Sequence, residues 1–275
     1  MALTSQSVAG GAAGAAAAAA ADHLAGRQQA SKLEDLDYSD RSTEFESDGS
    51  DCEGAASEDD AVAGACPNFT AEETLLILDW DDTLFPTAWI EAQGLSLAED
   101  SVPSEAQAEQ LEEMAERASL TVQVAKSHGT VVIVTNAEHG WIELSCQKFM
   151  PTLVPVLEDI KILSARSQWE CKGVAQPSAW KLLTFHGEID LFFGGCGSGG
   201  DEGTRRNIVS VGDSLYEREA LIRVTDRFPN SWAKALKLME KPGAQEFLKE
   251  HEVLISCLGD IVNHEGNLDV SICSP

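Results

Sequence analysis

The sequence predicts an α/β fold in which helices cover both faces of a parallel sheet. The chain has 275 residues, enough for one or two domains. From about Glu72 onward, short apolar runs alternate with longer stretches whose apolar residues recur at helical spacing. The run from Val131 to Val134 is apolar and β-branched throughout, which is typical of a strand buried on both faces. These observations predict a three-layer domain over residues 71–275.

The elements of this domain follow from composition and periodicity. Five segments read as strands: Thr74–Trp80, Thr130–Thr135, Ile160–Ser164, Asn207–Gly212 and Ala233–Met239. Four segments read as helices: Ser104–Ser127, Trp141–Phe149, Glu217–Val224 and Pro242–Val262. A further helix is expected to open near Lys181, and Thr87–Pro103 is expected to be a short loop. The glycine-rich stretch Gly194–Gly203 is interpreted as a surface loop, because no Gly-Lys-Ser/Thr follows it.

Residues 1–70 form a low-complexity tail. An alanine- and glycine-rich part precedes a serine-rich acidic part, and the tail has 3 basic and 13 acidic residues. The tail has few large apolar side chains, and their burial could not offset the entropy lost when the tail is ordered. We therefore expect it to be disordered. Its serines followed by acids would suit an acidophilic kinase, and a purely solvating tail is the alternative.

The composition excludes several classes of partner. The formal net charge of -27 and the pI near 4.4 argue against binding to nucleic acid and to anionic membranes. No apolar run is long enough to span a bilayer. The seven cysteines form no C-x-x-C pair, which favours reduced thiols in the cytoplasm or nucleus. An organellar transit peptide stays open, because residues 1–21 lack acids, although they also lack arginine.

The strongest chemical signal is Asp79-Trp80-Asp81-Asp82-Thr83, which follows the first apolar run. Side chains alternate along a strand, so Asp79 and Asp81 should project to the same side at the end where parallel sheets bind ligands. Trp80 and Asp82 then point away, Trp80 for packing and Asp82 for a hydrogen bond in the turn. Two adjacent carboxylates suit a magnesium ion and a phosphate better than a hydrophobic core.

Three weaker signals occur at equivalent places. Thr135-Asn136 ends the second strand, Lys181 lies near a helix start, and Gly212-Asp213-Ser214 ends the fourth strand, with Glu217 one turn later. Hydroxyl groups, amides and a lysine can hold phosphoryl oxygens, and further acids can complete an oxygen shell around magnesium. Each signal alone has an ordinary structural explanation, but their order and their placement after apolar strands make the joint signal strong.

Together these motifs resemble the haloacid dehalogenase-like hydrolase superfamily, over roughly residues 72–262. The resemblance implies a Rossmann-like sheet of order 5-4-1-2-3. It implies that Asp79 is the nucleophile and a magnesium ligand, and that Asp81 is the general acid/base whose backbone carbonyl also binds magnesium. It assigns phosphate binding to Thr135, Asn136 and Lys181.

The fourth motif of that family matches Asp213 as a magnesium ligand and Glu217 in a supporting role, to which Thr83 and Ser214 are added. Ser214 stands where some members carry a second aspartate. Lys172 is the rival for the motif lysine; Lys181 is preferred because the gap from Lys172 to Asp213 would be longer still.

The resemblance implies a magnesium-dependent phosphatase that forms an aspartyl-phosphate. Neither usual insertion point holds an obvious cap domain, so a phosphoprotein or another bulky phosphate ester is the expected substrate. A phosphotransferase or mutase with the same aspartate, or a catalytically silent interaction protein, are the alternatives. Trp141 and His139 are candidates for the cleft rim, His139 more simply as a surface residue, and Arg205 and Arg206 are candidate anion attractors. Oligomeric state is not predicted.

Overall fold

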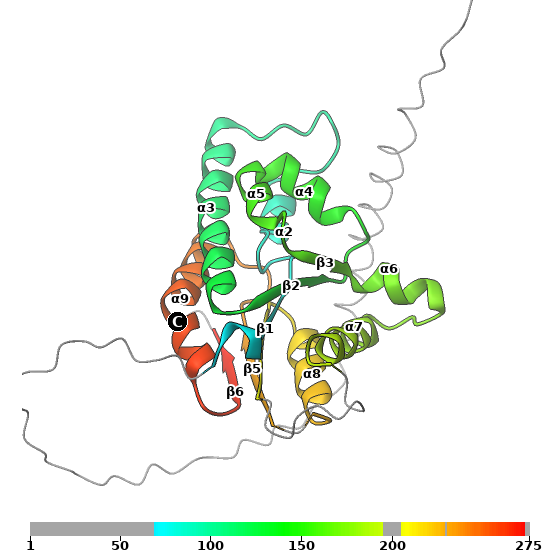
Figure 1. Ribbon diagram of the computed structural model, residues 1–275. Helices are drawn as coiled ribbons and strands as arrows, with labels where there is room; N and C mark the ends of the chain where they lie inside the picture. The colour runs from blue at the N-terminus through cyan, green and yellow to red at the C-terminus, as the bar shows by residue number, and fades with distance from the viewer. Residues whose placement is uncertain (1–68, 195–204, 229, 273–275) are drawn as a thin grey trace, which may run out of the picture.

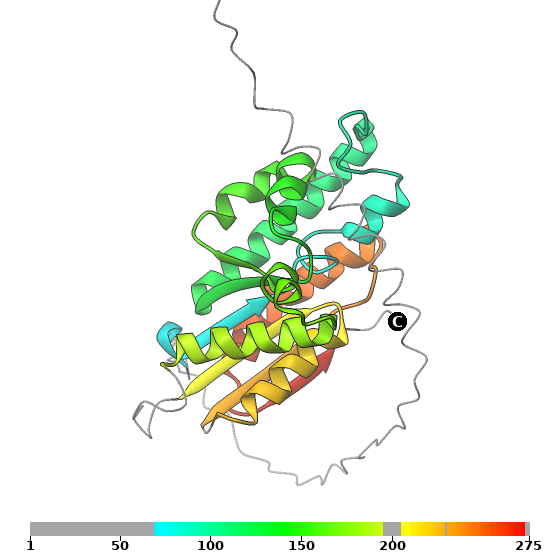
Figure 2. The ribbon, with the colours of Figure 1, turned by 90° about the vertical axis from the view of Figure 1, so that its right-hand side faces the viewer.

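The computed structural model describes residues 69–194, 205–228 and 230–272. Within these residues the chain forms one six-stranded, wholly parallel sheet between two layers of helices (Figure 1, Figure 2). The strands are β1 (Thr74–Leu78), β2 (Thr130–Thr135), β3 (Lys161–Ser164), β4 (Arg206–Gly212), β5 (Ser231–Lys237) and β6 (Leu268–Ser271). The predicted tail, up to residue 68, and most of the glycine-rich loop lie outside the described residues.

The strand order is β3-β2-β1-β4-β5-β6. The expected order named five strands, whereas the described residues contain six, so the expectation omitted the edge strand β6. This strand has four residues, three of them exposed, and therefore lacks the apolar pattern by which strands are found in a sequence. It pairs in parallel with β5 from Leu268 to Ser271.

Four helices lie close to their predicted bounds: α3 (Glu105–His128), α4 (Trp141–Phe149), α8 (Leu215–Thr225) and α9 (Ala244–Asn263). The helix expected to open near Lys181 is α7 (Pro177–Phe192), which begins before that residue. The shorter elements are α2 (Thr87–Ala92), α5 (Val154–Leu157), α6 (Ala165–Trp169) and the 3-10 turns η1 (Ala71–Glu73), η2 (Pro151–Leu153) and η3 (Glu170–Lys172). The segment Thr87–Pro103 was predicted to be a loop, which is wrong for its first third. There α2 buries Trp89 and Ile90 in the core, a tertiary contact that six residues of sequence do not reveal.

The core has two halves, one on each face of the sheet. Leu76 and Leu78 of β1 pack in the same cluster as residues of α3 and α9. Leu75 and Ile77 pack in a second cluster with residues of α7 and α8. Figure 1 shows α3 and α9 on one side of the sheet and α7 and α8 on the other. Each of these buried side chains contributes about 1.5–3 kcal/mol, so β1 is held firmly in the centre of the sheet.

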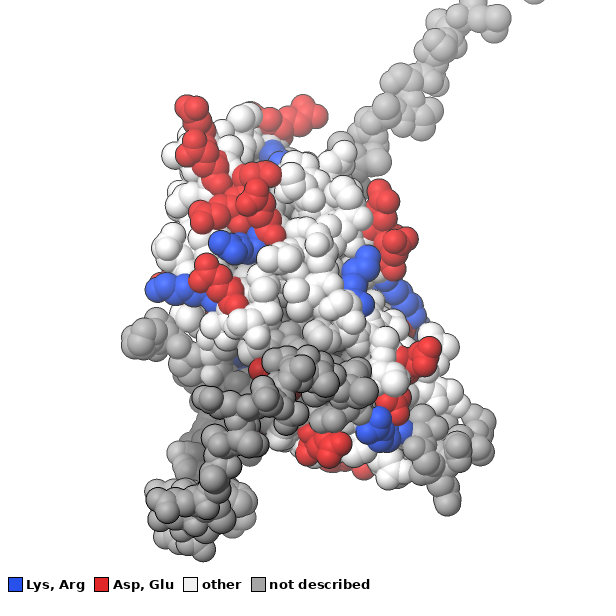
Figure 3. All heavy atoms as spheres, turned by 60° about the vertical axis from the view of Figure 1, so that its left-hand side comes forward, with Lys and Arg blue, Asp and Glu red and all other residues white. Residues whose placement is uncertain are grey.

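The surface of the α3 side carries many acids. Figure 3 shows acidic side chains gathered toward one end of this view. Helix α3 presents an exposed acidic row: Glu105, Glu109, Glu112, Glu113 and Glu116. Such a surface repels polyanions. Among the residues that the structure describes, no helix combines the length and the apolar character needed to span a bilayer.

Candidate active site

The acidic motif lies in a tight turn beyond β1. The strand was predicted to continue to Trp80, but it ends at Leu78, and the backbone N–H of Asp79 still donates to the carbonyl of Val211 in β4 at 2.9 Å. The carbonyl of Trp80 then accepts the backbone N–H groups of residues 83–85. Strand alternation therefore does not place Asp81; a turn does. Buried Trp80 stacks on Phe85 with centroids 5.4 Å apart, as the packing interpretation predicted.

Asp82 stabilises this turn. Its backbone has φ of 55°, a left-handed conformation that Asp tolerates better than most residues. Its Oδ1 accepts the backbone N–H of Ala88 at 2.7 Å, which confirms the predicted hydrogen bond in the turn. The side chain thus ties the acidic motif to the first turn of α2.

Lys181 is the lysine that reaches the acidic motif. It lies in the second turn of α7, is 1% exposed, and its Nζ is 2.6 Å from Asp79 Oδ1 and 2.9 Å from Glu217 Oε1. Its Nζ also donates to the carbonyl of Val134 at the end of β2. The rival Lys172 is exposed in η3, with its Nζ 4.1 Å from the ring centroid of Trp169. The geometry thus brings Lys181, and not Lys172, to Asp79.

Three buried carboxyl groups lie together in this site, and two of them pair with Lys181. Asp79, Asp213 and Glu217 each offer an oxygen within 4.8 Å of the other two. Asp79 and Asp213 follow the adjacent strands β1 and β4, and Glu217 comes from the first turn of α8. Glu217, expected only to support the site, belongs to this cluster, whereas the side chain of Asp81 lies outside it.

The start of α8 is built to hold Glu217 in place. Ser214 is its N-cap, and the Ser214 hydroxyl donates to Glu217 Oε2 in a capping box. A Cβ on Gly212 would lie only 2.5 Å from Glu217 Cγ, so glycine is needed where the strand passes this side chain. Both features fix the carboxylate toward Lys181.

Burial and charge act against each other in this cluster. Burial raises the pKa of Asp79, the charges of Glu217 and Asp81 act in the same direction, and Lys181 opposes them. Burial alone would lower the pKa of Lys181, but the charges of Asp79 and Glu217 raise it overall. Burial alone would raise the pKa of Glu217, but Lys181 and Ser214 hold it below its ordinary value. The lysine is therefore charged, and the buried acids outnumber it.

Asp81 has a different environment from Asp79. Its Oδ1 accepts hydrogen bonds from Thr87 Oγ1 at 2.6 Å and from Trp141 Nε1 at 2.9 Å. Its Oδ2 accepts from Thr135 Oγ1 at 3.3 Å. Trp141 was a candidate for the cleft rim, but no pattern in the sequence indicates that it or Thr87 contacts Asp81. These three donors to Asp81 are neutral groups, whereas a lysine faces Asp79.

The remaining predicted residues lie around these groups. Asn136 Nδ2 donates to the carbonyl of Pro177 at 3.4 Å and so links the end of β2 to the start of α7. The hydroxyl of Thr83 is buried without a hydrogen-bond partner among the described residues. His139 is exposed, in agreement with its simpler interpretation.

The two arginines proposed as anion attractors lie away from the acidic motif. Arg205 pairs with Glu73 at 3.0 Å, before β1 and therefore at the opposite end of the strand from Asp79. Arg206, the first residue of β4, is buried with its guanidinium 5.9 Å from the rings of Phe193 and Phe228. Both residues precede or begin β4, whereas Asp213 follows it.

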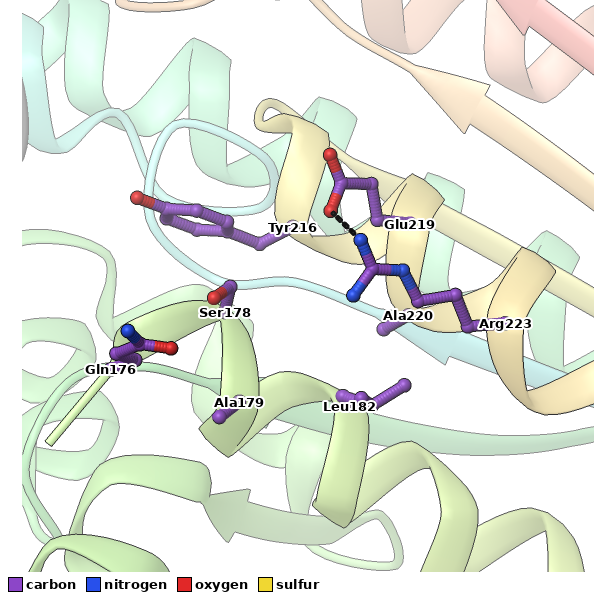
Figure 4. Close-up of a pocket in the computed structure, with 8 residues that line it drawn as sticks. All are labelled: Gln176, Ser178, Ala179, Leu182, Tyr216, Glu219, Ala220 and Arg223. Atoms are coloured by element: carbon purple, nitrogen blue, oxygen red, sulfur yellow. Dashed lines mark ion pairs between the residues drawn. The ribbon is translucent and has the colours of Figure 1, made fainter. Parts of the chain in front are cut away.

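A small cavity of about 220 Å³ lies between α7 and α8 (Figure 4). Gln176, Ser178 and Tyr216 line one end, and Arg223, in an ion pair with Glu219 at 3.3 Å, lies toward the other. Lys181 and Glu217 come from the same two helices but do not line the cavity. It therefore flanks the acid cluster and is separate from it.

Comparison of the chain with protein-family models, with curated proteins and with solved structures found no match. The geometry of the site and the sequence motifs are therefore the guides to its function.

Proposed function

We propose that this protein is a magnesium-dependent phosphatase that hydrolyses a phosphate monoester through an aspartyl-phosphate, as in the haloacid dehalogenase-like hydrolases that its motifs resemble. The observation that carries the proposal is the contact of Lys181 with both Asp79 and Glu217, beside Asp213 at the carboxyl ends of β1 and β4. This arrangement offers a nucleophile, a fixed positive charge and a set of hard oxygen ligands in one place.

The reaction follows from the two environments of the aspartates. An Asp79 oxygen forms a bond to phosphorus while the bond from phosphorus to the ester oxygen breaks, and the proton of Asp81 passes to that oxygen. Asp81 then takes a proton from water, the water oxygen bonds to phosphorus, and the bond to Asp79 breaks. Lys181 stabilises the charge that develops on the phosphoryl oxygens, and Thr135 and Asn136 bind the phosphate.

The donor set fits magnesium. Carboxylate oxygens are the ligands that this ion prefers, and Asp79 and Asp213 with the backbone carbonyl of Asp81 would hold it, with Glu217 in support. Up to three negative charges in the cluster face one lysine, so a divalent cation would balance the excess. When bound, magnesium supplies charge neutralisation for the phosphate.

The proposed substrate is bulky, a phosphoprotein in particular. The segment that could have formed a lid after β1 packs into the domain instead. Trp89 and Ile90 of α2 are buried in the core, and the carbonyl of Ala98 accepts a hydrogen bond from Lys148 in α4. A lid closes a site over a small ligand, so a site that this segment leaves open suits an ester carried on a macromolecule.

Hydrolysis of 4-nitrophenyl phosphate by the purified full chain tests the function. We expect turnover that needs Mg²⁺, that ends in excess chelator, and that is lost in Asp79→Asn with the fold retained. The matched control is Asp100→Asn, an exposed aspartate in the loop before α3, which should keep full activity. Full turnover in Asp79→Asn or in chelator would refute the assignment. Transfer of phosphate to an added acceptor in place of release would favour the phosphotransferase alternative, and no turnover would favour the silent protein.

The substrate class is tested separately, by comparing kcat/KM for phosphopeptides with that for sugar phosphates. A sugar phosphate preferred by about a hundredfold would overturn the proposed bulky substrate and leave the phosphatase chemistry intact.

A further inference from the structure

The two shortest hydrogen bonds described for the Asp81 side chain fall on the same oxygen, Oδ1. Thr87 and Trp141 donate to Oδ1 at 2.6 and 2.9 Å, and the contact from Thr135 to Oδ2 is the longest of these three at 3.3 Å. Thr135 is also engaged elsewhere, because its Oγ1 accepts the backbone N–H of Ala137 at 2.9 Å. The two short contacts therefore converge on Oδ1.

The indole of Trp141 is itself held in place by aromatic packing. Its ring meets Phe85 edge to face, with centroids 6.3 Å apart and an interplanar angle of 85°, and Phe85 stacks on Trp80. Trp141 is the first residue of α4, whereas Trp80 and Phe85 bound the turn that carries Asp81. The indole therefore keeps its N–H at a fixed place relative to that turn, which ordinary surface packing of a tryptophan does not require.

The two donors on Oδ1 decide which oxygen of Asp81 carries a proton. An indole N–H only donates and cannot accept, and Thr87 and Trp141 together take both lone pairs of Oδ1, so a proton there would have to displace one of the two donors. The proton of a neutral Asp81 then belongs on Oδ2. That is the proton which, in the proposed reaction, passes to the ester oxygen as its bond to phosphorus breaks.

We propose that Trp141, with Thr87, is a positioning residue that fixes Asp81 so that Oδ2 delivers the proton to the leaving group. This inference rests on the proposed phosphatase function. It has a specific consequence: loss of either donor should harm esters whose leaving oxygen needs a proton and spare esters whose leaving group departs as an anion. A purely structural role would affect all esters alike.

The test is a comparison of kcat/KM for phenyl phosphate and for 2,4-dinitrophenyl phosphate, in the presence of Mg²⁺. This ratio reports the steps up to cleavage of the ester bond and is independent of the later hydrolysis of the phosphoenzyme. The variants are Trp141→Phe, which keeps an aromatic ring against Phe85, and Thr87→Val, which keeps the shape of threonine. Thr87→Ser restores the hydroxyl group. Trp169→Phe is the matched control, because it removes an indole N–H that donates to Thr184 Oγ1, outside the contacts of Asp81.

General acid catalysis contributes about 10²–10⁴-fold, and a misplaced acid should lose part of it. We expect Trp141→Phe and Thr87→Val to lose about tenfold or more on phenyl phosphate and far less on the dinitrophenyl ester. Thr87→Ser should recover most of the loss, and Trp169→Phe should not discriminate between the two esters.

Equal losses on both esters, or no loss on either, would overturn the inference while the activity of the unmodified protein upholds the phosphatase function. No activity in the unmodified protein would overturn both. If Trp141→Phe unfolds, the comparison of Thr87→Val with Thr87→Ser decides alone, since the serine keeps the hydroxyl donor to Asp81 and the valine lacks it.

Discussion

Replacing Lys181 by Met should destabilise the protein strongly and abolish most activity. Lys181 is 1% exposed, and its side-chain partners Asp79 and Glu217 are 8% and 3% exposed, so the ion pairs lie in the interior. Methionine fills a similar volume but leaves two buried carboxyl groups without their cation. Breaking a buried ion pair in this way costs about 3–5 kcal/mol.

The matched control for this variant is Lys172→Met. Lys172 is exposed and its closest described interaction is with the face of Trp169, which is worth about 0.5–1 kcal/mol at an exposed site. Urea unfolding in chelator should therefore separate the two lysine variants by about 2–4 kcal/mol. Turnover should fall by about 10²–10³ in Lys181→Met and stay near that of the unmodified protein in Lys172→Met.

Unfolding in the presence of Mg²⁺ gives a second comparison between the variant without Lys181 and the unmodified protein. The variant without Lys181 has one positive charge fewer beside Asp79, Asp213 and Glu217, so Mg²⁺ should stabilise it more than it stabilises the unmodified protein. A ligand at a hundredfold its Kd contributes about 2.7 kcal/mol, which is enough to be seen in the unfolding midpoint. Equal stabilities of the two lysine variants, or the larger loss of activity in Lys172→Met, would refute the assignment of Lys181 to the site.

Two further outcomes concern the remainder of the domain. A chain that begins at Pro67 should keep the melting temperature and turnover of the full chain, and a lower melting temperature on removal of residues 1–66 alone would contradict this. In that shorter chain, Phe69→Ala should lower the free energy of unfolding by about 3–5 kcal/mol. Phe69 is buried, its ring meets Trp232 edge to face, and its ring centroid lies 4.5 Å from Lys234 Nζ. Burial lowers the pKa of His251 to about 3, against an ordinary value of 6.5, so its unfolded form binds a proton first as the pH falls. The contribution of His251 to the free energy of unfolding is therefore complete above pH 6.5 and should be about 2 kcal/mol smaller at pH 5. The variant His251→Asn should lack this difference between the two pH values. If the variant shows the same pH dependence as the unmodified protein, the histidine is not buried in its neutral form.

Much of the fold could be predicted because its signals are local. The apolar run of β2 and the long periodic helices α3 and α9 are evident within single windows of sequence. The failures are short elements whose stability comes from distant contacts. The six residues of α2 and the four of β6 lack enough periodicity to be recognised, and they form because Trp89 packs into the core and because β5 offers an edge for pairing.

The residues of the candidate site also fall into those with a local sequence signal and those placed by distant contacts. Asp79 and Asp213 could be found because each follows a recognisable strand, and Lys181 because it lies near the start of a helix. The topology brings the three together. The donors on Asp81 could not, since Trp141 is 60 residues away in sequence and an indole on a helix is ordinarily a packing residue. Only the turn of residues 80–85, which replaces the predicted end of the strand, places Asp81 beneath that indole.

The acid cluster is costly for a fold that needs only stability. Replacing a buried ion pair by well-packed apolar residues is often neutral or stabilising by about 1–4 kcal/mol, yet here two buried carboxyl groups pair with one buried lysine and a third carboxyl group lies beside them. Further features of the chain serve this arrangement: Gly212 leaves room for Glu217, Ser214 orients it, and the left-handed backbone of Asp82 turns the chain so that Asp81 meets Thr87 and Trp141. Residues that depart from local rules without a gain in packing are most often functional. In this domain such departures gather at the carboxyl ends of β1 and β4, where a parallel sheet binds its ligand.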